Sequence, residues 1–318
     1  MNNFEESVVN TVKSRQFIEK FKKALNYTEY NYFEMLVAHY DEKIIKDSQL
    51  EGQHFKEFYR IKGSGFDELK KELVDNENCN YVTYFNKVAK EGLTPDNVSV
   101  LAKRIYSSDA IREVLSSQIL NAVEVPTCAN ISFYETYKDA PTRILGSVDF
   151  ISDGEMFING SDFKGGYNHF SKLGDTVQGI RKMLASHEIT KNNPELSQKL
   201  LDDFVYSYLM RRLVLGDHDC HPWNCGLLVN KKENYIKLVN FDYENSFLQA
   251  RIGECEDAIK FSKEKFPKVY EKYMFYVKNM IKAVKQVIPD VEDTYHKNLI
   301  KNLRDNILSV IATDELVM

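Results

Sequence analysis

The stretch that decides the fold of this chain is residues 215–226, Leu-Gly-Asp-His-Asp-Cys-His-Pro-Trp-Asn-Cys-Gly. Acidic, basic and amide side chains crowd into these few positions, and a glycine stands near each end. An apolar stripe at helical spacing precedes the stretch, and two strand-like segments follow it and lead to Asp242. The pattern predicts a loop held between a buried helix and a hairpin, a setting in which catalytic side chains commonly lie.

Three side chains in and after this loop suggest a specific chemistry. Asp219, Asn224 and Asp242 are the residue types needed to move a phosphoryl group from ATP bound with Mg²⁺. In this interpretation Asp219 accepts the proton of a substrate hydroxyl, and Asn224 and Asp242 supply oxygen ligands for the metal ion. Taken singly, Asp219 and Asn224 are also common turn residues, so it is their combination with Asp242 that favours catalysis.

Other side chains of the loop raise the alternative of a zinc site. They are His218, Cys220, His221 and Cys225, and their spacing does not reproduce a Cys-x-x-Cys or His-Glu-x-x-His pattern. We expect the two cysteines to act as small apolar packing groups. His221 is a candidate catalytic-site residue beside Asp219, and the role we expect for it is to brace the loop.

A second group of candidates lies earlier in the chain. Lys103 falls on a predicted strand, residues 98–106, ten residues before Glu113 on a predicted helix, residues 110–121. A strand lysine that contacts ATP phosphates and is steadied by a helix glutamate is a nucleotide clamp of the kinase type. The competing candidates for this lysine are Arg104 and Lys62, and a surface lysine with an unrelated glutamate is the plain alternative.

No glycine-rich phosphate loop can be identified. The chain contains neither G-x-G-x-x-G nor G-x-x-x-x-G-K-[ST]. Its short glycine pairs, at residues 63–65 and 165–166, are typical of turns. The sequence therefore predicts the lysine of a nucleotide site but not the loop over the phosphates.

Composition limits the remaining possibilities. The 318 residues are 43% hydrophobic and 28% charged, with a net charge of −5 and a pI near 5.9, which does not indicate nucleic-acid binding. Five cysteines without a disulfide framework favour a reducing compartment. We find no secretory signal and no membrane-spanning run, so we expect synthesis in the cytoplasm, with signal-free export left open.

The periodicity along the chain predicts an α+β fold. Helical spacing extends over residues 4–47, with Phe17, Phe21 and Leu25 on one face, and residues 54–62 form a predicted strand. Further predictions are a hairpin at residues 128–138 and 142–151, a helix that starts at Asn193-Pro194, strands at residues 226–229 and 235–241, and C-terminal helices interrupted at Pro267 and Pro289. Mixed α/β structure thus extends to about residue 152, and mainly helix follows.

These residues resemble a known family. Gly216-x-x-Asp219-x-His221-x-x-Asn224, followed by Phe241-Asp242, resembles the HipA-like serine/threonine kinases. The segment from Glu113 through Val125-Pro126 resembles a helix of that family's N-lobe, and residues 240–246 are most similar to a compact proinflammatory bacterial kinase of the class. The core Asp-x-His-Pro-x-Asn also occurs in aminoglycoside and choline phosphotransferases.

The resemblance implies a two-lobe protein-kinase-like fold, with an N-lobe at residues 1–152 and a C-lobe at residues 153–318. It implies ATP and Mg²⁺ as cofactors, a protein Ser/Thr acceptor, autophosphorylation, and the action of a bacterial effector on host-cell proteins. Asp219 would be the catalytic base, Asn224 and Asp242 the metal ligands, and Lys103, steadied by Glu113, the ATP-phosphate lysine.

The chain departs from conventional kinases at several positions. Asp217 replaces the histidine of H-R-D, Tyr243 and Glu244 stand where Phe-Gly follows the metal-binding Asp, and there is no A-P-E. Activation-loop control of the conventional kind is therefore not expected. The rival hypotheses are a small-molecule phosphotransferase with the same core, a catalytically dead binding module and a zinc hydrolase.

Overall fold

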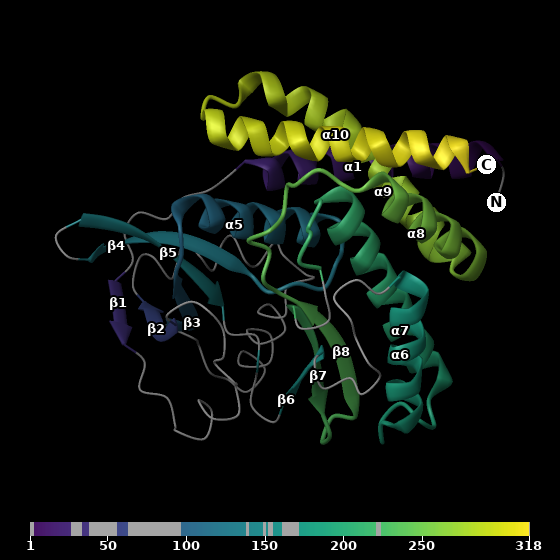
Figure 1. The fold of residues 1–318 in the computed structure, drawn as a ribbon, viewed down its shortest axis with the longest axis horizontal. Coiled ribbons are helices and arrows are strands. Elements are labelled where there is room, and N and C mark those ends of the chain that lie inside the picture. Colours follow the sequence, from purple (N-terminus) through teal and green to yellow (C-terminus); the bar gives the residue numbers. More distant parts are fainter. Residues whose placement is uncertain are drawn as a thin grey trace.

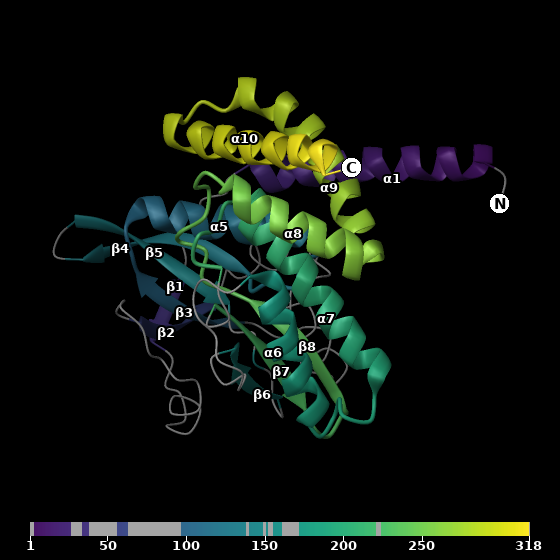
Figure 2. The same ribbon diagram turned by 45° about the vertical axis from the view of Figure 1, so that its right-hand side comes forward.

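The computed structural model describes residues 3–26, 34–37, 56–62, 97–137, 140–148, 151, 155–160, 172–220 and 224–317. Within these ranges, two antiparallel sheets lie on one side of the molecule and several long helices lie on the other (Figure 1). Figure 2 shows the same division, with α10 away from the sheets. Both α1 and α10 pack against α9.

The larger sheet has five strands in the order β1-β2-β3-β5-β4, and every neighbouring pair is antiparallel. The strands are β1 (Glu34–Val37), β2 (Lys56–Lys62), β3 (Asn97–Arg104), β4 (Asn130–Tyr137) and β5 (Ala140–Val148). Helix α5 (Ser107–Ala122) connects β3 to β4 and packs against β4 and β5. This connection brings Glu113 of α5 next to Lys103 of β3.

The smaller sheet has three antiparallel strands in the order β6-β7-β8. They are β6 (Glu155–Asn159), β7 (Cys225–Asn230) and β8 (Tyr235–Asn240). Thr127 pairs with Asn240 in an isolated parallel bridge, and the Asn240 side-chain amide donates to the carbonyl of Pro126 at 2.7 Å. These contacts fix the segment after α5 to the end of β8, two residues before Asp242.

The remaining helices supply most of the core. They are α1 (Asn3–Leu25), α6 (Leu173–Ser186), α7 (Pro194–Tyr208), α8 (Ile252–Lys265), α9 (Pro267–Val287) and α10 (Thr294–Leu316). Helix α7 begins where the Asn193 side chain accepts a hydrogen bond from the backbone of Leu196 at 3.1 Å, and its first helical residue is a proline. The predicted apolar stripe runs from Leu200 on this helix to Leu213 on the π-helix that follows it, and it is buried except at the half-buried Tyr208.

Helix α1 packs against α5 and α9, far from it in sequence (Figure 1). Phe17, Phe21 and Leu25 are buried on its inner face, as predicted. The ring of Phe17 meets the ring of Tyr276 on α9 edge to face, with centroids 4.8 Å apart. The N-terminal helix is therefore part of the same core as the C-terminal helices.

The structure confirms the α+β class, the strand at β2, the hairpin of β4 and β5, and the hairpin of β7 and β8. The lobe boundary at residue 152 stays a prediction. Among the described helices, none has the length and apolar character needed to cross a lipid bilayer.

Some local predictions were wrong. Helical spacing was expected to continue through residue 47, but Glu34–Val37 is a strand paired with β2. The second half of the chain was expected to hold one hairpin, but β6 adds a third strand to it. The helix predicted at residues 110–121 starts earlier, because Ser107 is already helical, and its N-cap, Tyr106, makes no side-chain capping bond.

Candidate active site

The loop that carries Asp219 begins at a tight bend in the backbone. Helix α7 continues into a π-helix, Leu209–Val214, a form of helix that is often found at functional sites. Gly216 then adopts φ +61°, and a Cβ there would lie 1.8 Å from the carbonyl oxygen of Leu248. Only glycine fits this bend, and the chain leaves it directly into Asp217 and Asp219.

Two neighbours fix the position of Asp219. Its backbone N–H donates to Oδ1 of the buried Asp217 at 3.1 Å. The Asn224 side-chain amide donates to the Asp219 carbonyl at 2.9 Å and to its Oδ2 at 3.1 Å. The two residues that the sequence singled out at this spacing are therefore in direct contact, and the Asp219 side chain is half-buried.

Asp242 follows the end of β8, and Asn224 stands just before the start of the neighbouring strand β7. The N–H of Phe241, one residue before it, donates to the Asn224 carbonyl at 3.1 Å. Asp242 itself has φ +64°, a left-handed conformation that is uncommon outside glycine and that is found at functional sites. This turn directs the chain toward β3 and α5.

Lys103, Glu113 and Asp242 meet at one point, as the clamp hypothesis requires. The Lys103 Nζ lies 3.4 Å from Asp242 Oδ1 and 3.9 Å from Glu113 Oε1. Burial alone would lower the pKa of Lys103, but the carboxylates of Glu113 and Asp242 more than offset this effect and raise it above 10.5. The ammonium group therefore stays charged in the buried site.

Glu113 is the most buried member of this group, with 1% of its side chain exposed. Its Oε2 accepts from the Asn130 side-chain amide at 3.0 Å, and Asn130 in turn accepts from the Ser147 hydroxyl at 2.8 Å. Burial raises the pKa of Glu113 to about 8, although Lys103 opposes the rise. The protonated form is thus available near neutral pH.

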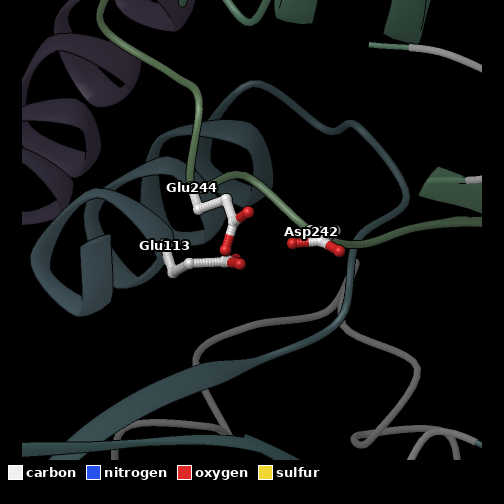
Figure 3. A group of neighbouring side chains, drawn as sticks. All are labelled: Glu113, Asp242 and Glu244. Atoms are coloured by element: carbon white, nitrogen blue, oxygen red, sulfur yellow. The ribbon is translucent and has the colours of Figure 1, made fainter. Parts of the chain in front are cut away.

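Sequence reasoning missed a third carboxylate, Glu244. Oxygen atoms of Glu113, Asp242 and Glu244 all lie within 4.8 Å of one another, and this is a set that could hold a metal ion (Figure 3). Carboxylate oxygens are suitable ligands for Mg²⁺, so Asp242 and the neighbouring Glu244 fit such an ion chemically. The Asp-x-Glu spacing directly after a strand was the available signal for Glu244.

A buried arginine, Arg211, was also missed. It lies on the π-helix with 1% of its side chain exposed, and it hydrogen-bonds both to the Asp219 loop and to the backbone of Asp242. Its signal in the sequence was a charged residue inside an otherwise apolar helical stripe.

The remaining residues that the sequence suggested for the site do not join this group in the described structure. His221 lies outside the described residues, so its bracing role stays a prediction. Lys62 pairs with Asn97 at the far end of the β2–β3 ladder, whereas Lys103 is the residue that reaches Glu113 and Asp242. The short glycine pairs at residues 63–65 and 165–166 also lie outside the described residues.

The zinc alternative gains no support from the described part of the loop. Burial raises the pKa of the Cys220 thiol to about 11 and that of Cys225 to about 12, which disfavours the thiolates that zinc requires. A ring nitrogen of His218, Nε2, lies 2.9 Å from the carbonyl oxygen of Gln249. Among described residues, the metal-compatible group is the carboxylate set of Glu113, Asp242 and Glu244.

The sequence matches no protein-family model and no curated protein. Solved structures of other proteins are similar, and two of them are the following. The Helicobacter pylori proinflammatory kinase CtkA matches with a TM-score of 0.46 and 14% identity, over 71% of this chain and 94% of that one. Shewanella oneidensis MR-1 HipA, solved with HipB and operator DNA, matches with a TM-score of 0.47 and 10% identity, over 69% of this chain and 60% of that one.

Both are HipA-like kinases, the class that the sequence resembles. CtkA is also the compact proinflammatory kinase to which residues 240–246 are similar. The similarity is too low to bear on activity, so the case for a function rests on the residues of the site.

Proposed function

We propose that this chain is an ATP- and Mg²⁺-dependent kinase that transfers the γ-phosphoryl group to Ser or Thr hydroxyls of proteins. The main support is the meeting of Lys103, Glu113 and Asp242, which come from a strand, a helix and a loop far apart in the sequence. Surface ion pairs are common, but a lysine with 10% of its side chain exposed that contacts two carboxylates marks a site that can receive phosphate.

Each residue has a defined task in this proposal. Lys103 contacts the phosphates of ATP, and Glu113, fixed by Asn130, keeps the lysine in place. Asp242 and Asn224 hold Mg²⁺, which neutralises the charge of the phosphates when it is bound. Asp219 accepts a hydrogen bond from the acceptor hydroxyl and takes its proton as the oxygen attacks the γ-phosphorus, while the bond from that phosphorus to the β–γ bridging oxygen breaks and ADP leaves.

The contacts of Asp219 fit the role of a base next to a metal ligand. Asp219 is half-buried on its loop, and its Oδ2 is held by the Asn224 amide at 3.1 Å. The proposed base and one proposed metal ligand are thus joined directly, so an acceptor hydroxyl bound to Asp219 would lie close to a phosphate held by the metal ion. Positioning of this kind supplies much of the rate enhancement in phosphoryl transfer.

The direct test is incubation of the purified protein with γ-labelled ATP and Mg²⁺, with and without a general acceptor protein. We expect transfer by the wild type and a loss of at least about 100-fold in D219N, because general-base catalysis contributes on that order. D242N should lose activity through weakened metal binding, while D290N, at an exposed position, is the matched charge control. Equal transfer by wild type and D219N would refute the proposal.

Mass spectrometry of the reaction distinguishes the acceptor classes. Phosphate on Ser or Thr of the chain itself or of the added protein supports the protein-kinase proposal, including autophosphorylation. ADP formation that depends on an added aminoglycoside or choline, with no phosphoprotein, would instead identify a small-molecule phosphotransferase.

A further inference from the structure

Arg211 makes a set of contacts that the proposed roles above do not use. Its guanidinium donates to Asp217 Oδ2 from Nε at 2.8 Å and from Nη2 at 2.6 Å. Nη1 donates to the Asn224 carbonyl at 2.8 Å and to Asn240 Oδ1 at 3.4 Å, and Nη2 donates to the Asp242 carbonyl at 3.0 Å. These five hydrogen bonds match the five N–H groups of an arginine side chain.

The partners of Arg211 lie on three separate segments of the proposed site. Asp217 receives two of the bonds, and its other oxygen accepts from the N–H of Asp219. The two carbonyl partners belong to Asn224 and Asp242, the proposed metal ligands. One side chain thus connects the backbone of the proposed base to the backbones of both ligands.

We infer that Arg211 is a positioning residue that holds the loops of Asp219, Asn224 and Asp242 in one fixed arrangement. The inference rests on the proposed function for its catalytic consequence, although the connection between the loops stands on the contacts alone. Arg211 touches no reacting atom, so it acts through the residues that it orients.

The buried charge of Arg211 is balanced locally. Burial would lower its pKa, but Asp217, which is fully buried, raises it, so the guanidinium stays a cation. The ring of Tyr243 lies 4.7 Å from the guanidinium carbon and covers it. Lysine has three donors on a single nitrogen and cannot reproduce this planar set of five bonds.

The next residue, Arg212, offers a matched control. It donates to the carbonyls of Asp217 at 3.2 Å and His218 at 2.6 Å, and it pairs with Glu254. It therefore contacts the loop before Asp219, while its described hydrogen bonds do not extend to Asn224 or Asp242. R212K removes contacts with the Asp219 loop alone, whereas R211K removes the contacts that connect all three segments. Comparing the two variants therefore isolates the effect of the connection.

The experiment compares R211K and R212K with the wild type by kinetics and by amide hydrogen exchange. We expect R211K to lower kcat by about 100-fold and to raise the Mg²⁺ concentration needed for half-maximal rate, because displacements of about 1 Å cost this much. Exchange should rise in R211K both at residues 217–220 and at residues 240–244. In R212K we expect exchange to rise only at residues 217–220, with the Mg²⁺ requirement unchanged.

If R211K fails to fold, the double variant R211M/D217N takes its place. It removes both charges of the buried pair, so that no ion is left without its partner, and Asn at position 217 still offers an acceptor to the Asp219 N–H. The same kinetic loss and the same faster exchange at residues 240–244 are expected.

The outcomes separate this inference from the proposed function. If R211K, or the double variant, keeps the kcat, the Mg²⁺ requirement and the hydrogen exchange of the wild type, the positioning role of Arg211 is overturned. If the wild type shows no phosphoryl transfer, the kinase proposal fails, and exchange alone then decides whether Arg211 connects the loops. A uniform loss of thermal stability, with kcat and Mg²⁺ requirement unchanged in the folded fraction, would mark Arg211 as structural only.

Discussion

Replacing Glu113 with glutamine removes a carboxyl group that is almost completely buried and whose pKa is raised to about 8. Between about pH 4.5 and 8 the folded protein keeps the Glu113 proton while the unfolded chain loses it. The contribution of Glu113 to the free energy of unfolding therefore falls as pH rises, by ~1.4 kcal/mol per pH unit. Over the full interval from 4.5 to about 8 this amounts to about 5 kcal/mol.

Glutamine cannot ionise, so E113Q should lack this dependence. Its side-chain oxygen can still accept from Asn130, as Glu113 Oε2 does at 3.0 Å. The carboxylate of Asp242, which also raises the pKa of Lys103, is unchanged in E113Q. We expect the stability of E113Q relative to the wild type to increase by about 4 kcal/mol between pH 5 and pH 8.

The assay is urea unfolding at pH 5, 6.5 and 8, without nucleotide and with EDTA to remove divalent cations. E271Q, at an exposed position of α9, controls for the loss of a carboxyl group in general. Parallel pH profiles for E113Q and wild type, with a constant difference in unfolding free energy, would refute the raised pKa of Glu113 and the burial argument behind it.

Three further substitutions test the fold by urea or thermal unfolding. Phe21→Ala should cost about 3–5 kcal/mol because the ring is fully buried between α1 and its neighbours; a cost below about 1 kcal/mol would contradict that packing. Gly216→Ala should lower the free energy of unfolding by more than the ~1–2 kcal/mol that a left-handed backbone costs an alanine, because the new Cβ would also clash with Leu248. An unchanged free energy of unfolding would show that the backbone does not bend at Gly216 as described. Asn193→Ala should cost about 1 kcal/mol through loss of the cap to Leu196, with N193D close to wild type.

Local signals predicted the parts of the fold that depend on nearby residues. The apolar stripe from Leu200 to Leu213 gave α7, and Asn193-Pro194 gave its start, because periodicity and capping act within one or two turns. The pairing of Lys103 with Glu113 was predicted from kinase chemistry, and in the fold β3 and the following helix α5 bring the two side chains together.

The missed features depend on distant or unusual contacts. Glu34–Val37 is a short, mainly apolar segment, so its hydrophobic periodicity does not distinguish a strand from a helix. Its pairing with β2 makes it a strand. β6 pairs with β7 across a long separation in sequence that no local pattern records. The place of Glu244 follows from the left-handed turn at Asp242, and the role of Arg211 follows from three loops that meet only in the folded protein.

The packing of α1 on α9 has a consequence for how the chain folds during synthesis. Tyr276 follows its partner Phe17 by 259 residues (276 − 17), so at ~5–20 residues per second the ribosome needs roughly 13–50 s to supply it. Throughout that interval the apolar face with Phe17, Phe21 and Leu25 lacks its final partner. Part of the apolar face of α1 therefore stays uncovered until α9 has been synthesised.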